Sequence, residues 1–120
     1  MKNARQRIEL ERKAEELRQV LRRRGRLVVE QAPDQLDHVL LAAERESATL
    51  EMERCSRLLR QVEFALERLR TGEYGSCIKC ESEISEKRLA AIPWALYCIE
   101  CQEAVDELHR RVESVWEPAA

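Results

Sequence analysis

The sequence predicts a mainly α-helical protein: a long antiparallel coiled-coil hairpin, a small compact region containing four cysteines, and a C-terminal helix. Three observations support this fold class. The composition is 37% charged and 4% aromatic, which is typical of long solvated helices rather than of a large globular core. Apolar residues recur at spacings of three and four along most of the chain. Glycine and proline are confined to a few points, so long stretches contain no helix breaker.

The first predicted element is a helix over residues 2–24. Its coiled-coil seam, with spacings of four, three and four, consists of Leu10, Ala14, Leu17 and Leu21. Gly25 follows three arginines and is expected to stop this helix. Residues 25–34 are then expected to form the turn of the hairpin, with the apolar residues 27–29 folding back onto the stalk.

The second predicted element is one long helix over residues 35–71, since no glycine or proline lies between Asp34 and Gly72. Pro33 ends any preceding helix, and Asp34 is a suitable N-cap. At about 1.5 Å per residue this helix is roughly 55 Å long. Its expected seam has a stutter near Arg54 and consists of Leu36, Leu40, Ala43, Ser47, Leu50 and Arg54, followed by Leu58, Val62, Ala65 and Leu69.

The chain is expected to divide into a hairpin over residues 1–71, with its tip near 25–37, and a compact region with a C-terminal helix over 72–120. The last helix is expected at 99–116, and its apolar face is expected to contain Val105, Leu108, Val112 and either Val115 or Trp116. The first helix is shorter than the second and cannot cover it completely. We therefore expect the C-terminal helix to pack at the base of the hairpin.

Four of the five cysteines form the pattern Cys77-x2-Cys80-x17-Cys98-x2-Cys101. Two C-x-x-C turns at this separation are typical of a tetrahedral zinc site. A shell of four thiolates leaves no position for water or substrate, so the zinc is expected to be structural. Cys55 lies far from the other four in the sequence and is expected to be a surface or seam residue of the second helix.

Charge and hydropathy exclude several classes of function. The net charge is −2, with ten lysines and arginines against four acids in residues 1–26 and eleven against nineteen in residues 27–120. No apolar stretch is long enough to span a membrane, and the charged N-terminal segment does not resemble a secretory signal, so a cytoplasmic location is expected. No nucleophile–base pair, open metal site or phosphate-binding loop is evident, so no enzymatic activity is expected.

Residues 72–101 closely resemble the zinc-finger signature of the DksA/TraR family, and residues 32–37 resemble the tip of that family's coiled coil. The tip resemblance includes Asp34 and Asp37, two aspartates three residues apart. Within the finger, the matching positions are Gly72, Tyr74, Gly75, Cys77, Cys80, Ile84, Arg88, Leu89, Ala91, Pro93, Cys98 and Cys101. Three positions depart from the family pattern: Gln35, Val39 and Glu81.

The resemblance implies a transcription regulator that binds bacterial RNA polymerase directly. In this family the coiled coil enters the secondary channel of the polymerase, and the acidic tip approaches the active site. Asp34 and Asp37 are the matching tip residues here, although capping of the helix alone would also account for them. The resemblance leaves open whether the nucleotide ppGpp acts jointly with the protein, since no nucleotide-binding residue is matched.

Two other interpretations stay open at this point. A DNA-binding zinc module would need basic residues beside the metal, yet residues 72–101 carry three lysines and arginines against five glutamates. A structural or adaptor coiled coil with another partner is the second alternative. In every case we expect a monomer, without direct sequence-specific DNA binding and without membrane insertion.

Overall fold

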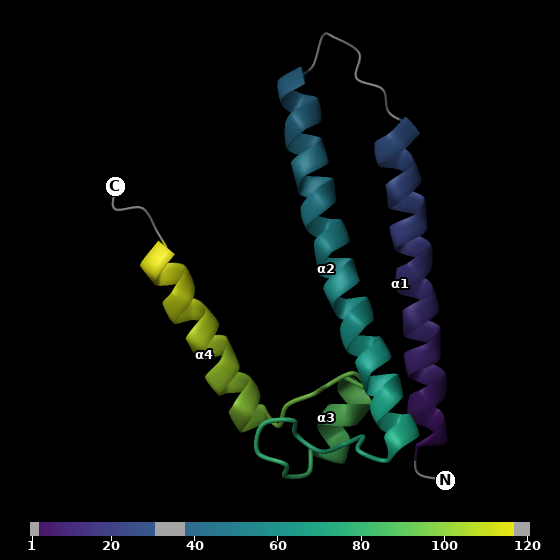
Figure 1. Cartoon of the computed structure of the whole chain (residues 1–120), viewed down its shortest axis with the longest axis vertical. Coiled ribbons are helices and arrows are strands. Elements are labelled where there is room, and N and C mark those ends of the chain that lie inside the picture. The colour runs from purple at the N-terminus through teal and green to yellow at the C-terminus, as the bar shows by residue number, and fades with distance from the viewer. Residues whose placement is uncertain (1–2, 31–37, 117–120) are drawn as a thin grey trace.

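The computed structural model describes residues 3–30 and 38–116, and side chains within residues 3–25 and 42–112. It contains four helices: α1 (Ala4–Glu30), α2 (His38–Thr71), α3 (Glu86–Ala91) and α4 (Ile99–Trp116). In Figure 1, α1 and α2 lie side by side as an antiparallel pair, α3 and its loops lie at their base, and α4 points away. The described residues form no β-strand, only a bridge between Ser76 and Glu83. The predicted mainly α-helical class is confirmed.

The lower half of the hairpin has the core that the sequence predicts. In α1, Leu10, Ala14 and Leu17 are buried. They pack against Val62, Ala65 and Leu69 of α2, which are buried as well. Because these six side chains exclude water from one continuous seam, burial of apolar surface stabilises the base of the hairpin.

The expected seam in the upper half of α2 is wrong. Ala43, Ser47, Leu50 and Arg54 are all exposed, and Leu50 retains 51% of its accessible surface. The half-buried positions there include Ala48, Met52, Cys55 and Leu59, which continue into Val62 at spacings of four, three, four and three. Between Ala48 and Val62 this stripe therefore has no stutter. The sequence allowed two stripes with heptad spacing, and packing selected the one without an arginine or a serine at its centre.

Gly25 does not end the first helix. α1 continues through it to Glu30, so residues 25–30 belong to the helix rather than to a turn. A Cβ at Gly25 would lie 4.0 Å from Cε of Met52, so this glycine lies beside α2. An ion pair between Arg24 and Glu51 joins the two helices next to it. Contacts with α2 outweigh the roughly 1 kcal/mol that a glycine costs a helix.

The rest of the predicted tip, residues 31–37, lies outside the described residues. The predicted N-cap Asp34 and the start of the second helix at residue 35 fall within it. From His38 onward, α2 follows the prediction and ends at Thr71.

The C-terminal helix has the predicted bounds, but its predicted packing at the base is wrong. α4 diverges from the hairpin (Figure 1), and Leu108 and Val112 are 61% and 53% exposed. Tyr74 and Trp94 pack against the hairpin core in its place. These two rings come from the loops around α3, close in space to the end of α2. None of the helices described is both long enough and apolar enough to cross a membrane.

Candidate metal centre

The compact region begins where glycine ends α2. Gly72 has a φ of 82°, a left-handed conformation that glycine adopts at little cost. The amides of Glu73 and Tyr74 both donate to the carbonyl of Arg68, at 2.9 and 3.1 Å. This pattern is a Schellman-type C-cap, which satisfies a carbonyl at the helix end. The chain therefore turns sharply at the base of the hairpin and leads directly to the first cysteine pair.

The first cysteine turn is held by its own backbone. The amide of Cys77 donates to the carbonyl of Ser82 at 2.8 Å, and the amide of Glu81 donates to the carbonyl of Cys77 at 3.0 Å. Glu81 has a φ of 64°, the left-handed region that disfavours every residue with a Cβ. The resemblance to the DksA/TraR family implies a glycine at this position, and the left-handed φ gives a physical reason for one. The glutamate adopts the same turn at a cost in strain.

The second cysteine turn lies at the start of α4. Cys98 accepts a hydrogen bond at 2.9 Å from the amide of Gln102 through its carbonyl, so Cys98 and Cys101 flank the first helical turn. The short helix α3 leads the chain there. Ser85 caps α3 by accepting from the amide of Arg88 at 3.1 Å, and the guanidinium of Arg88 donates to the carbonyl of Tyr97 at 3.1 Å.

The four cysteines predicted from the sequence come together at one point. Their Sγ atoms, from Cys77, Cys80, Cys98 and Cys101, all lie within 4.8 Å of one another. The Sγ atoms of Cys80 and Cys98 are 3.7 Å apart. Zinc–sulfur bonds of about 2.3 Å in a tetrahedron set neighbouring sulfurs about 3.8 Å apart, so the cluster has the dimensions of a four-thiolate zinc site.

The close arrangement of the four thiols also suits a cation. Burial raises the pKa of Cys77, but backbone hydrogen bonds from Cys80, Cys98 and Lys79 outweigh it and lower this pKa to about 6. A hydrogen bond with the hydroxyl of Ser82, at 2.7 Å from Sγ, lowers the pKa of Cys80. The neighbouring thiols, Cys98 foremost, raise the pKa of Cys101 to about 12. Four thiolates at this spacing repel one another, and a divalent cation removes that repulsion.

The metal centre is joined to the hairpin by side chains that the sequence analysis did not single out as functional. The guanidinium of Arg68 donates to the carbonyls of Glu73 and Ser76, at 2.8 and 2.6 Å. The hydroxyl of Tyr74 donates to the carbonyl of Pro93 at 2.8 Å. Burial, with a smaller effect from Glu9, raises the pKa of Tyr74 to about 12. These bonds fix both cysteine-bearing loops to the end of α2.

Two more contacts come from the hairpin side. The side-chain amide of Gln61 donates to the carbonyl of Trp94 at 3.0 Å. The ammonium of Lys13 lies 5.7 Å from the centre of the Trp94 ring, a cation–π distance. Helices α1 and α2 thus each provide a polar residue that holds Trp94. Such partners lie far apart in the sequence, so no local motif could have identified them.

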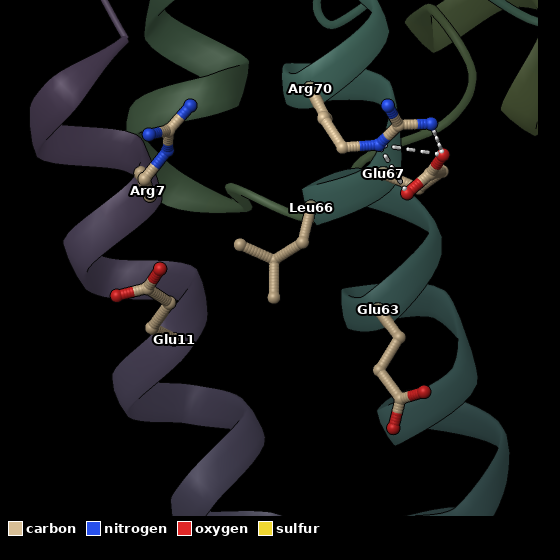
Figure 2. A pocket seen from close by; sticks show the side chains of 6 residues that line it. All are labelled: Arg7, Glu11, Glu63, Leu66, Glu67 and Arg70. Carbon is tan, nitrogen blue, oxygen red and sulfur yellow. Dashed lines mark hydrogen bonds and ion pairs between the residues drawn. The ribbon is translucent and has the colours of Figure 1, made fainter.

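A groove of about 420 Å³ between α1 and α2 is a second candidate site by shape (Figure 2). Leu66 points between the helices, and the guanidinium of Arg70 folds onto the carboxylate of Glu67, with an Nε–Oε1 distance of 3.0 Å. This hydrogen bond lowers the pKa of Glu67. Because Arg70 is paired within its own helix and three glutamates line the groove, we do not assign a ligand to it.

The remaining candidates lie elsewhere. Asp34 and Asp37 fall outside the described residues, so their predicted role at the tip stays a prediction. Cys55 is half-buried against the hairpin core and lies on its seam, apart from the metal centre.

Comparison with known proteins supports the identity of this centre. Residues 72–107 match the family model described as the prokaryotic dksA/traR C4-type zinc finger. A solved structure of transcription factor DksA2 from Pseudomonas aeruginosa is 32% identical, with a TM-score of 0.75, and the match covers 88% of this chain and 83% of that one. The chain belongs to the DksA/TraR family. With the cysteine geometry, this membership supports a structural zinc ion.

Two curated relatives are named RNA polymerase-binding transcription factor DksA. The protein from Haemophilus influenzae is 32% identical over 83 residues, which cover 67% of this chain and 55% of the relative. The protein from Escherichia coli is 34% identical over 73 residues, which cover 58% of this chain and 46% of the relative. The aligned part of the chain thus spans about half the length of these relatives.

Proposed function

We propose that this protein regulates transcription by binding bacterial RNA polymerase directly, with its coiled coil inserted into the secondary channel. The observation that carries this proposal is the match to the DksA2 structure, which extends over the hairpin as well as the zinc finger. The names of the curated relatives support the same partner. The expected location is the cytoplasm, where the polymerase is.

The shape of the molecule suits this role. α2 has 34 residues and is therefore about 51 Å long. The radius of gyration is 18.5 Å, against about 14 Å for a compact domain of this length. The zinc centre and the buried lower seam make a fixed base, from which the hairpin extends as a narrow probe. A channel admits such a shape, and a flat partner surface would not require it.

Asp34 and Asp37 are the residues we propose to act at the tip. Residues 32–37 resemble the coiled-coil tip of the family, and in that resemblance these two aspartates match the family's acidic tip residues. We propose further that Cys77, Cys80, Cys98 and Cys101 ligate one zinc ion that supports the base without taking part in chemistry. Zinc supplies rigidity there, since the four thiolates fill its coordination shell.

The test is multi-round in vitro transcription on a ribosomal-RNA promoter, with binding to core RNA polymerase measured in parallel. We expect the wild-type protein to bind and to change transcript yield. The variant with Asp34→Asn and Asp37→Asn should bind but lose that effect. A parallel series with ppGpp tests whether the nucleotide contributes.

The matched control carries Glu100→Gln and Glu103→Gln. These exposed acids are also three residues apart near a helix start, but they lie on α4. This variant should keep the wild-type effect. If the wild-type protein neither binds polymerase nor alters transcription, the structural or adaptor interpretation replaces the proposal. If both double variants lose activity equally, the tip has no special role.

A further inference from the structure

The four cysteines of the metal centre differ in how far water can reach them. Cys77 is buried, Cys98 and Cys101 are half-buried, and Cys80 is exposed. In a filled shell of four thiolates, a chelator can take the metal only after one of the sulfur ligands has left it. The exposed ligand is the one that an outside competitor reaches first. Retention of zinc therefore depends most on how firmly Cys80 is held.

Ser82 bonds to the sulfur of Cys80 in two ways. Its hydroxyl oxygen lies 2.7 Å from Sγ of Cys80, and its backbone amide donates to the same sulfur. A zinc-bound cysteine is a thiolate, which can only accept, so the hydroxyl of Ser82 is the donor there. Hydrogen bonds to a charged acceptor are stronger than those between neutral groups. The buried Cys77 accepts from backbone amides, so Ser82 gives the exposed ligand a donor of a different kind.

The backbone holds Ser82 in place for this contact. The carbonyl of Ser82 accepts from the amide of Cys77 at 2.8 Å, and Ile84, two residues further on, is buried. The position of Ser82 is thus fixed by the first cysteine turn on one side and by the core of the zinc finger on the other. Only the rotation of its own side chain must be restricted to form the hydroxyl bond. A donor that is already in position loses little entropy when it bonds.

The strained backbone at Glu81 has a purpose in this arrangement. Its φ of 64° turns the chain back directly after Cys80, and the next residue is the one whose amide and hydroxyl both bond to that sulfur. A left-handed residue with a Cβ costs free energy and persists where the surrounding contacts demand it. The two bonds from Ser82 to Cys80 are contacts that oppose this cost.

We propose that Ser82 is a positioning residue of the metal centre, whose hydroxyl holds the exposed Cys80 thiolate as a ligand and slows the loss of zinc. Ser82 is not itself a ligand, since the four thiolates fill the coordination shell. Partners that hydrogen-bond to metal ligands typically contribute about 10-fold to 100-fold to metal affinity. The inference rests on the proposed ligation of zinc by the four cysteines, but not on the binding of RNA polymerase.

The test is the rate at which the zinc-loaded full chain loses its metal to the chromogenic chelator 4-(2-pyridylazo)resorcinol, followed by absorbance. Ser82→Thr and Ser82→Val introduce side chains of the same shape, and only threonine keeps the hydroxyl. The threonine variant should release zinc within about twofold of the wild-type rate, and the valine variant at least about tenfold faster. The comparison of these two variants isolates the hydroxyl from any effect of side-chain size.

A spectroscopic measurement separates support of the ligand from general loosening of the zinc finger. With Co²⁺ bound in place of zinc, the sulfur-to-cobalt charge-transfer band reports the electron density on the thiolates. Loss of a hydrogen bond raises the energy of the sulfur lone pair, so Ser82→Val should move this band to lower energy and Ser82→Thr should not. The control is Ser85→Ala, which removes the hydroxyl that caps α3. It should lower stability and leave the band unchanged.

Three results would count against the proposal. Equal release rates and equal cobalt spectra for the threonine and valine variants, at full zinc occupancy, would overturn it. A band shift in Ser85→Ala as large as that in Ser82→Val would show that the spectrum follows stability and not the hydroxyl of Ser82, and would overturn it as well. A wild-type chain that binds no zinc would refute the proposed ligation by the four cysteines, and this inference with it.

Discussion

The two halves of the hairpin are built from similar helical sequence, yet they are held in different ways. In the lower half, Leu10, Val62 and Ala65 are at most 1% exposed, and the rings of Tyr74 and Trp94 cover the seam from outside. In the upper half, the described part of the α2 seam contains no fully buried residue, and Arg24 and Glu51 pair across it at the surface. Stability is therefore concentrated at the base, next to the metal. The upper half depends on that base for its position.

Removal of the metal should have the largest effect on stability, because it weakens the base on which the upper half of the hairpin depends. Chelation of zinc, or Cys98→Ser, removes the cation that holds four repelling thiolates, and metal-binding energy is folding energy in such small sites. We expect the melting temperature to fall by at least about 10 °C, with loss of helical circular dichroism from α4.

Cys55→Ser is the matched control for that experiment. Cys55 lies on the hairpin seam and not in the four-sulfur cluster, so its replacement should change stability by only about 1 kcal/mol and leave zinc content unchanged. An unchanged melting temperature after complete zinc removal would mean that the metal does not stabilise the base.

Leucine truncation in the two halves should give the next largest contrast. Leu10→Ala removes a fully buried side chain and should cost about 2–5 kcal/mol in the free energy of unfolding. Leu50→Ala removes a side chain that is 51% exposed and should cost less than about 0.5 kcal/mol. Urea denaturation measures both. Equal costs would support the seam through Ala43, Ser47 and Leu50 instead of the one described.

Replacement of Arg68 tests how the metal centre is attached. Arg68→Met keeps much of the aliphatic volume but loses two hydrogen bonds from a charged donor to the carbonyls of Glu73 and Ser76. The expected cost is about 2–3 kcal/mol, with zinc stoichiometry retained. Arg70→Met is the control, because Arg70 pairs with Glu67 on an exposed surface, within its own helix. A similar loss in both variants would show that the attachment does not depend on Arg68.

The smallest expected effect is a gain in stability. Glu81 has a φ of 64°, so Glu81→Gly should relieve left-handed strain and stabilise the zinc finger by about 1 kcal/mol. Glu83→Gly, two residues away and without a positive φ, should instead destabilise by up to about 1 kcal/mol. Thermal melting of the zinc-loaded proteins distinguishes the two signs. A destabilising Glu81→Gly would show that the turn carries no strain.

The sequence by itself determined the features that depend on local spacing. The bounds of α4, the end of α2 at Thr71 and the lower seam through Leu10 and Val62 all follow from periodicity and from the glycine after the helix. The four cysteines could be predicted as zinc ligands because two C-x-x-C turns at that separation are typical of a zinc site. Gly72 indicates a left-handed C-cap, because a positive φ after a helix end favours glycine through backbone sterics alone.

Only the tertiary structure decided which face each helix buries. Two stripes of α2 have heptad spacing, and contact with α1 selects the one through Met52 and Cys55 over the one through Leu50. Gly25 stays helical because Met52 and the Arg24–Glu51 pair lie beside it, contacts that local propensity cannot include. The direction of α4 could not be predicted from the sequence either, because it too depends on tertiary contacts. Apolar spacing predicts a face to be covered, but only the tertiary structure shows that the hairpin leaves Leu108 and Val112 exposed.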